Sequence, residues 1–498
     1  MKMSNHRNVA VQKAALDQMN QITEQIKKNA PKELASTGDI TVISEIPSEG
    51  YYIKEKGTYV LGNDITWAPP VNGFLFAAIV IQCDNVVLDF KGHTLSIHNP
   101  KNDGDYSSMG VIVLNSDYPT ACSNVTVTNG TIKDMGICGL WAFKTNNLSV
   151  SKITVKGLSN PNFNLLPSGI SLWDAESFRV SDCFVKNIEL TALMGSGILI
   201  LNSKTGIVSN CTVDTFTNHD GVASGYNYLQ SSGIETKSCT ATNLTTFYAG
   251  NPASIIGHTC IGFMMTACKS LTFSECSASV MKGCCDDCHG MSLYWIDKAK
   301  VTHFKASHVH DGNGAQKTGA KATGLEVYGK DITISKCQVS DITAIVPQDL
   351  QSTGFSVCGT NIKLDSCSAT SVTALDANGS PDISHGYGTG FGWAPDPRPS
   401  NVKPANGITY KNCVANNCQL GFDTWSHQNS KWINPSTKGK TLSHLIQPSS
   451  ATRIFSMNFC SELPGANPSS KSKQFTIHNQ IEGSTNTYPD DWNNQQEE

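Results

Sequence analysis

The chain has 498 residues, a formal net charge of −4, and only 16% charged residues. A chain with this weakly acidic balance lacks the basic surface that non-specific nucleic-acid binding requires. No apolar run reaches the roughly 18 residues needed to cross a bilayer, so the sequence excludes a membrane span.

The N-terminal segment differs in pattern from the rest of the chain. Residues 9–30 have helical propensity, and their apolar residues recur at helical spacing. These apolar residues are Val11, Ala15, Met19, Ile22 and Ile26. We predict that residues 1–40 form a helical cap on a repeat domain spanning residues 41–460, because the open end of a stack of strands needs a cover. Residues 1–10 lack the apolar core of a secretory signal, which indicates a cytoplasmic location or export by a non-standard route.

A glycine followed by alternating apolar residues recurs along the domain at intervals of 24 to 41 residues. The glycines are Gly110, Gly139, Gly169, Gly197, Gly221, Gly262, Gly290, Gly324, Gly354, Gly390 and Gly421. Alternation with period two in short segments is typical of β-strands. Strands this short must stack on neighbouring copies to bury their inner face. The pattern predicts an all-β fold, a single-stranded right-handed parallel β-helix of about eleven turns.

A second motif runs in phase with the glycines and ends in a cysteine. The cysteines are Cys183, Cys211, Cys239, Cys276, Cys337, Cys367 and Cys413, and Phe304 takes the equivalent place in one turn. Because cysteine packs as a small apolar residue, we predict a cysteine ladder in the core. Four residues later a polar residue recurs, which predicts a sharp turn. These turn residues are Asn187, Thr215, Asn243, His308, Asp341, Ser371 and Asn417.

Three segments near the start of the domain carry a resemblance to a known family. Residues Tyr51–Leu61, Asn85–Leu95 and Asn124–Ile132 resemble the opening of pectin-lyase-like right-handed β-helix proteins. The resemblance covers about residues 45–425 and implies the fold. It implies no single activity, because the family includes polysaccharide lyases, glycoside hydrolases, epimerases, pectin esterases, phage tailspikes and non-enzymatic scaffolds.

The register of the repeat brings polar side chains onto neighbouring turns. The candidate catalytic residues are Asp220, Asp286, Asp287, His289, Glu326, His310 and Asp311. Paired carboxylates can protonate a leaving oxygen and activate water, as glycosidic chemistry requires. We predict that Asp220 and Asp287 form the acid/base pair and that His289 positions the substrate. Each of these residues, taken alone, is also explained as a polar turn or loop residue.

Short elements at these positions resemble parts of the polygalacturonase signature. They are Asn218-His-Asp220, Asp286-Asp287 and His289-Gly290. In this chain the last two elements are contiguous, and the Arg-x-Lys element of the signature is absent. The departures favour a neutral or lightly charged glycan over a polyuronate.

Aromatic residues give the glycan hypothesis further support. Trp173, Tyr294, Tyr328 and Trp425 each lie four residues after a glycine of the repeat, and Trp393 lies in a long segment between Cys367 and Cys413. Sugar faces stack on aromatic rings, so we predict that these five residues bind substrate. The alternative is that the rings pack beneath loops.

A metal site is a weaker alternative. His258, Cys260 and Cys288 come from adjacent turns, and such ligands suit zinc or copper. Their spacing is not that of a standard metal site, so we expect no cofactor.

Two functional hypotheses therefore remain. The first is a carbohydrate-active β-helix that binds an extended polysaccharide on one face and acts on it as a hydrolase, lyase or epimerase. The second is a non-catalytic β-solenoid that acts as a scaffold, fibre or surface interaction protein. Trimers are frequent among fibre-like β-helices, but the sequence does not specify an oligomeric state. Residues 461–498 are polar and are predicted to form an irregular tail.

Overall fold

The computed structural model describes strands and turns from residue 40 to residue 477. The described ranges are 40–69, 76–97, 108–115, 120–160, 166–219, 221–247, 258–284, 287–312, 321–345, 352–376, 379–380, 388–392, 405–422, 427–428, 431–438, 453–460 and 474–477. Every regular element in these ranges is a β-strand, and no helix among them is long and apolar enough to cross a membrane. The helical cap predicted for residues 1–40 lies outside the described residues, apart from residue 40.

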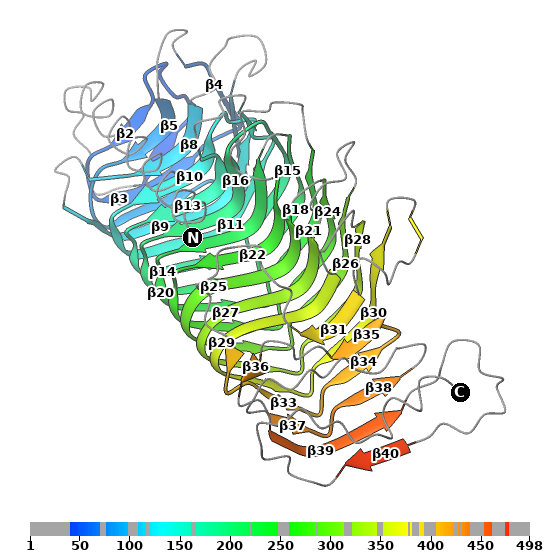
Figure 1. The fold of residues 1–498 in the computed structure, drawn as a ribbon. Helices are drawn as coiled ribbons and strands as arrows, with labels where there is room; N and C mark the ends of the chain where they lie inside the picture. Colours follow the sequence, from blue (N-terminus) through cyan, green and yellow to red (C-terminus); the bar gives the residue numbers. More distant parts are fainter. Residues whose placement is uncertain are drawn as a thin grey trace.

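Consecutive turns pair in parallel, and their strands stack on three faces of one rod (Figure 1). The predicted parallel β-helix is therefore confirmed. Side chains that point inward from all three faces form one continuous apolar core along the rod.

The first face carries the glycine of the repeat. Its strands are β2 (Tyr51–Ile53), β5 (Phe76–Ile81), β8 (Ser108–Val113), β10 (Cys138–Phe143), β13 (Ser168–Trp173), β16 (Met194–Leu201), β19 (Val222–Leu229), β22 (Cys260–Thr266), the first halves of β25 (Asp287–Thr302), β27 (Lys321–Ser335) and β29 (Ser352–Asp365), and then β31 (Gly388–Gly392) and β35 (Leu420–Phe422).

The second face follows after a corner. Its strands are β1 (Thr41–Ile43), β3 (Gly57–Leu61), β6 (Val86–Asp89), the first parts of β9 (Cys122–Lys133) and β11 (Thr145–Lys156), then β14 (Glu176–Ser181), β17 (Lys204–Ser209), β20 (Ser232–Lys237), β23 (Lys269–Ser274), the second halves of β25, β27 and β29, and finally β32 (Ala405–Asn406), β33 (Thr409–Lys411), β36 (His427–Gln428), β37 (Lys431–Ile433) and β39 (Arg453–Cys460).

The third face completes each turn. Its strands are β4 (Ile65–Trp67), β7 (Thr94–Ile97), the last parts of β9 and β11, β12 (Ser159–Asn160), β15 (Phe184–Leu190), β18 (Thr212–Asn218), β21 (Thr240–Thr246), β24 (Ser277–Gly283), β26 (Lys305–Asp311), β28 (Gln338–Ile345), β30 (Ser368–Leu375), β34 (Val414–Asn416) and β38 (Ser436–Lys438).

Close packing at the first face explains the glycine of the repeat. A Cβ added to Gly290 would lie 2.5 Å from the Gly324 carbonyl oxygen of the next turn and 2.6 Å from Ala306 Cβ across the core. Real Cβ contacts are longer than this, so a side chain at Gly290 would force the backbone of two turns apart.

The prediction that Gly221 is the repeat glycine of its turn is wrong. Ser196 of β16 pairs with Ser224 of β19, so Gly225 occupies the repeat position that was predicted for Gly221. As a result Ser224, and not Asp220, directly precedes the glycine on this turn. The error arose because Gly221-Val-Ala-Ser and Gly225-Tyr-Asn-Tyr both offer a glycine before a short strand.

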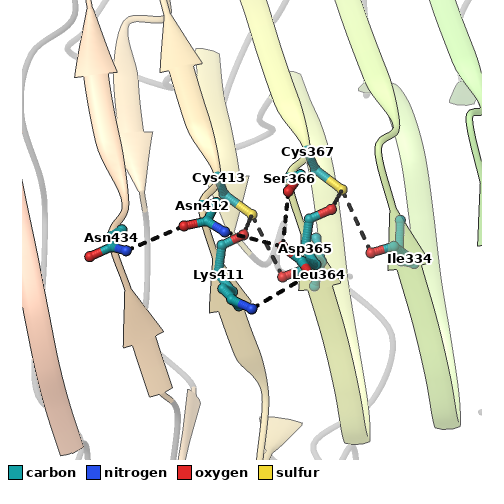
Figure 2. A network of polar contacts seen from close by, with 9 residues as sticks. All are labelled: Ile334, Leu364, Asp365, Ser366, Cys367, Lys411, Asn412, Cys413 and Asn434. Atoms are coloured by element: carbon teal, nitrogen blue, oxygen red, sulfur yellow. Dashed lines mark hydrogen bonds and ion pairs between the residues drawn. The ribbon is translucent and has the colours of Figure 1, made fainter.

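The cysteines stack inside the corner between the second and third faces. Each thiol donates to a carbonyl oxygen of the preceding turn, as Cys367 Sγ does to Ile334 at 3.7 Å and Cys413 Sγ to Leu364 at 3.8 Å (Figure 2). Every cysteine in the described part of the chain is free. Outside the same corner, Asn434 donates to Asn412 at 3.3 Å, so polar side chains stack there from turn to turn.

The turn residues predicted from the repeat adopt the backbone that such corners need. Six of the seven have φ between 54° and 57°, and Asn417 has φ of 51°. Asparagine and aspartate tolerate this left-handed conformation better than most residues because their short side chains bond locally. The corners confirm the turn prediction.

The C-terminal tail contains at least one strand. Strand β40 (Gln474–Ile477) pairs antiparallel with β39, whereas the other described strand pairs are parallel. This four-residue strand is the described part of the tail predicted at 461–498.

Candidate active site

An ionisable cluster lies on the outside of the first face, where β25 and β27 pair. The side chains of Cys288, Met291 and Leu293 belong to the apolar core. Asp287 and His289 flank Cys288, and Ser292 lies between Met291 and Leu293, so these three residues point outward. The residues of β27 opposite these three are Lys321, Thr323 and Glu326.

His289 stands between two carboxylates. Its Nε2 atom is 3.8 Å from Asp287 Oδ2, and its Nδ1 atom is 3.9 Å from Glu326 Oε2. Glu326 is held by two further groups: Lys321 Nζ lies 2.7 Å from Oε1, and the Ser292 hydroxyl donates to Oε2 at 2.8 Å. The two carboxylates, the imidazole and the ammonium thus form one connected network.

Burial differs sharply within this cluster. The side chains of His289, Lys321 and Glu326 are 3%, 7% and 12% exposed, whereas Asp287 is 32% exposed. Burial raises the pKa of Asp287, but a hydrogen bond from His289 and the charges of His289 and Lys321 outweigh it. The pKa of Asp287 is therefore lowered, and this carboxylate is ionised at neutral pH.

Two polar atoms of the cluster are buried and make no hydrogen bond within the described structure. They are His289 Nδ1 and Thr323 Oγ1, which lie opposite each other on β25 and β27. Thr353 Oγ1 and Thr389 Oγ1 of the next two turns are unpaired in the same way, so Thr323 Oγ1 does not distinguish the cluster. Buried polar groups are nearly always paired, and an unpaired imidazole nitrogen close to a carboxylate indicates a place where a proton is accommodated.

A pair of tyrosines extends the cluster along the same two strands. Tyr294 and Tyr328 pair across β25 and β27, and their rings stack with centroids 5.2 Å apart. Each tyrosine lies two residues beyond Ser292 or Glu326, so it points to the same outer side.

The structure separates the other described candidates from this cluster. His310 lies on β26 of the third face, where its Nε2 atom is 3.2 Å from Asp341 Oδ2. Asp311 is buried, and its carboxylate accepts hydrogen bonds from the backbone amides of Gly312 and Lys321. Asp311 therefore fixes the start of β27 rather than facing the His289 cluster.

Trp173 occupies the predicted row of the first face but is covered. It is 3% exposed and packs edge-on against Trp141, with ring centroids 4.7 Å apart. In this conformation its ring has no free face for a sugar. The predicted site residues Asp220, Asp286, Trp393 and Trp425 lie outside the described residues.

The weak metal alternative gains no support from the described part of the chain. Cys260 and Cys288 pair on β22 and β25 and belong to the core, and the Cys260 thiol donates to the Leu244 carbonyl oxygen at 3.4 Å. No group of three or more His, Cys, Asp or Glu side chains there is arranged to hold a metal ion.

Sequence analysis missed Lys321. It lies three residues before Gly324, as Asp287 lies three residues before Gly290, and the two residues pair across the strands. Extending the comparison of repeats one position further upstream would have found it.

The family described as right-handed β-helix region matches residues 43–215 of the chain. No curated protein matches the chain significantly. The family match and the parallel strand ladders together identify the fold as a right-handed parallel β-helix.

Solved structures with similar folds have low sequence identity. ORF18 of Geobacillus virus E2 is 11% identical with a TM-score of 0.34, and the similarity covers 87% of this chain and 58% of that chain. The tailspike protein of E. coli bacteriophage HK620, in complex with pentasaccharide, is 13% identical with a TM-score of 0.44, covering 82% and 74%. The A-module of the Azotobacter vinelandii mannuronan C-5 epimerase AlgE6 is 9% identical with a TM-score of 0.36, covering 80% and 89%. This chain thus spans less than two thirds of the viral ORF18 chain, and similarities this distant do not identify a substrate.

Proposed function

We propose that this right-handed parallel β-helix binds an extended glycan across the outer surface of β25 and β27 and cleaves or modifies it by acid/base chemistry. The observation that carries the proposal is the Asp287–His289–Glu326–Lys321 network beside a stacked tyrosine pair. Converging ionisable groups, one of them a carboxylate with a shifted pKa, beside a pair of aromatic rings are suited to carbohydrate chemistry.

Asp287 is the residue that we assign as general base. It is the most exposed carboxylate of the network, and its lowered pKa keeps it ionised. An ionised carboxylate can accept a proton from water or from a sugar carbon, or stabilise the positive charge of an oxocarbenium-like transition state.

His289 is the residue that we assign as the carrier of the proton. Its two ring nitrogens face different carboxylates, at 3.8 Å and 3.9 Å. An imidazole in this position can exchange a proton with Asp287 at Nε2, so that a proton which Asp287 takes up in one step is returned through Asp287 in the next. This assigns His289 a chemical step in place of the positioning role predicted from the sequence.

Glu326 and Lys321 hold this arrangement in place. With one oxygen bound to Lys321 and the other to Ser292, Glu326 is poorly placed to release or take a proton. We assign both residues a positioning role, in which Glu326 orients the imidazole. The sequence-based pair of Asp220 and Asp287 is replaced, in this proposal, by Asp287 and His289.

The test is incubation of the purified protein with a broad panel of polysaccharides, followed by mass spectrometry of released fragments. Products that carry an added water indicate hydrolysis, and products lighter by one water indicate a lyase. Unchanged mass with altered sugar stereochemistry indicates an epimerase. If folded protein acts on no glycan and binds none, the scaffold hypothesis replaces this proposal.

A further inference from the structure

The charges of the site determine which glycans it accepts. The inference drawn from them rests on the proposed function. We propose that the site selects glycans that carry free amino groups and rejects those that carry carboxylates. The recognised group is a sugar ammonium, and Asp287 is the residue that binds it.

No unpaired cation faces the ligand within the described part of the site. Lys321 is the only Lys or Arg among β22, β31 and the first-face segments 287–294, 321–328 and 352–358. Its ammonium is 2.7 Å from Glu326 Oε1, and both side chains are nearly buried. A ligand carboxylate would have to break this pair and leave Glu326 as a buried, unpaired charge, which is costly.

Asp287 is the group of the cluster that a ligand reaches. Its side chain is 32% exposed, while His289 behind it is 3% exposed. Lys321 is paired with Glu326, so Asp287 is the carboxylate of the network that forms no ion pair with a lysine or arginine in the described residues. A sugar ammonium would form a charge-assisted hydrogen bond with Asp287, whereas a uronate carboxylate would meet a like charge.

His289 Nδ1 is buried and makes no hydrogen bond within the described structure. Buried polar groups are nearly always paired, so this unpaired nitrogen in the ring beside Asp287 supports a site at the Asp287 carboxylate. The site therefore offers one negative position for the amine.

The experiment is titration calorimetry with three oligosaccharides of equal length, at a mildly acidic pH that keeps the sugar amine protonated. The ligands are oligomers of glucosamine, N-acetylglucosamine and galacturonate. We expect the glucosamine oligomer to bind at least about tenfold more tightly than the N-acetylated one, since a new charge-assisted contact is worth about one decade or more in Kd. The galacturonate oligomer should bind weakest of the three.

Variants on one strand localise the preference. Asp287→Asn should abolish the preference for the amine, so that the glucosamine and N-acetylglucosamine oligomers bind within a few-fold of each other. Asp297→Asn serves as the matched control: this residue also lies on β25 but faces Lys269 and Lys330 on the second face, so the preference should stay intact. In the wild type the preference should shrink as salt is added, a readout that needs no variant.

Equal or tighter binding of galacturonate, or an amine preference that survives Asp287→Asn, would overturn the inference. Binding of the neutral oligomer with no charge preference would overturn it while leaving the proposed function intact. Failure of the wild type to bind or act on any glycan would refute the proposed function and this inference together.

Discussion

The ion pair between Lys321 and Glu326 is the residue-level feature on which the site depends most. Both side chains are nearly buried, so removing one partner leaves a charge without compensation. We expect Lys321→Met to lower the free energy of unfolding by about 3 kcal/mol, the usual cost of breaking a buried pair. Urea denaturation of the purified variant measures it.

A second change tests this explanation. In the double variant Lys321→Met with Glu326→Leu no charge is left unpaired, so most of the lost stability should return. If the double variant is as unstable as Lys321→Met alone, packing rather than the ion pair explains the loss.

The lowered pKa of Asp287 gives the site its own dependence on pH. Burial raises that pKa. The hydrogen bond from His289 and the charges of His289 and Lys321 lower it by more, so the pKa is lowered overall. A lowered folded-state pKa stabilises the fold above the unfolded value of about 3.9, and this contribution disappears as pH falls through the folded value.

Comparison of wild type with Asp287→Asn detects this contribution. The difference in unfolding midpoint between the two proteins should be largest near neutral pH and should shrink at about pH 3 and below. A difference that stays constant across this range would contradict the assigned pKa shift.

Sequence could predict Asp287, His289 and Glu326 as neighbours because the repeat fixes which residues lie opposite each other. It could not rank their roles. The ion pair from Lys321, the hydroxyl of Ser292 and the unequal burial depend on side-chain packing that the spacing of glycines does not encode.

At the level of the strands, the glycine of the repeat is needed for space. Gly290 has no left-handed backbone to explain it, yet an added Cβ would lie 2.5 Å from the Gly324 carbonyl oxygen. We expect Gly290→Ala to destabilise the protein by about 3 kcal/mol, as overpacking of a rigid core does. Thermal and urea unfolding measure the loss.

Gly92→Ala is the matched comparison. Gly92 has open space around its Cβ position but φ of +84°, so its cost is conformational only, about 1 kcal/mol. Equal losses for the two variants would show that crowding between turns is not the reason for the repeat.

Between Cys276 and Cys337, the described ladder position is occupied by Phe304 in place of a cysteine. Its ring is fully buried and meets Phe263 edge-on, with centroids 5.8 Å apart. Changing Phe304→Cys would restore the repeat consensus but leave a cavity, so we expect a loss of about 3 kcal/mol.

Cys276→Ala, one turn earlier, is the comparison variant. Because it removes only the sulfur atom of a buried side chain, we expect it to lower the free energy of unfolding by about 1 kcal/mol. A neutral or stabilising Phe304→Cys, measured by the same unfolding assay, would mean that the ladder tolerates cysteine at every turn.

At the scale of the whole molecule, the repeat predicted the architecture because one local pattern recurs with its register intact. The error at Gly221 shows the limit of that approach: two glycines stand four residues apart, and only strand pairing decides that Gly225 belongs to the first face. The strand pairing likewise places the proposed site on the first face and His310 apart from it on the third face.

Asp287 is proposed to act on a glycan at the outer surface of β25 and β27. The most direct measurement is fragment release from a polysaccharide panel by wild type, Asp287→Asn and Asp297→Asn at equal concentrations of folded protein. We predict that wild type and Asp297→Asn convert the same glycan, whereas Asp287→Asn is slower by about 100-fold or more. Undiminished conversion by Asp287→Asn, or no conversion by folded wild type, would contradict it.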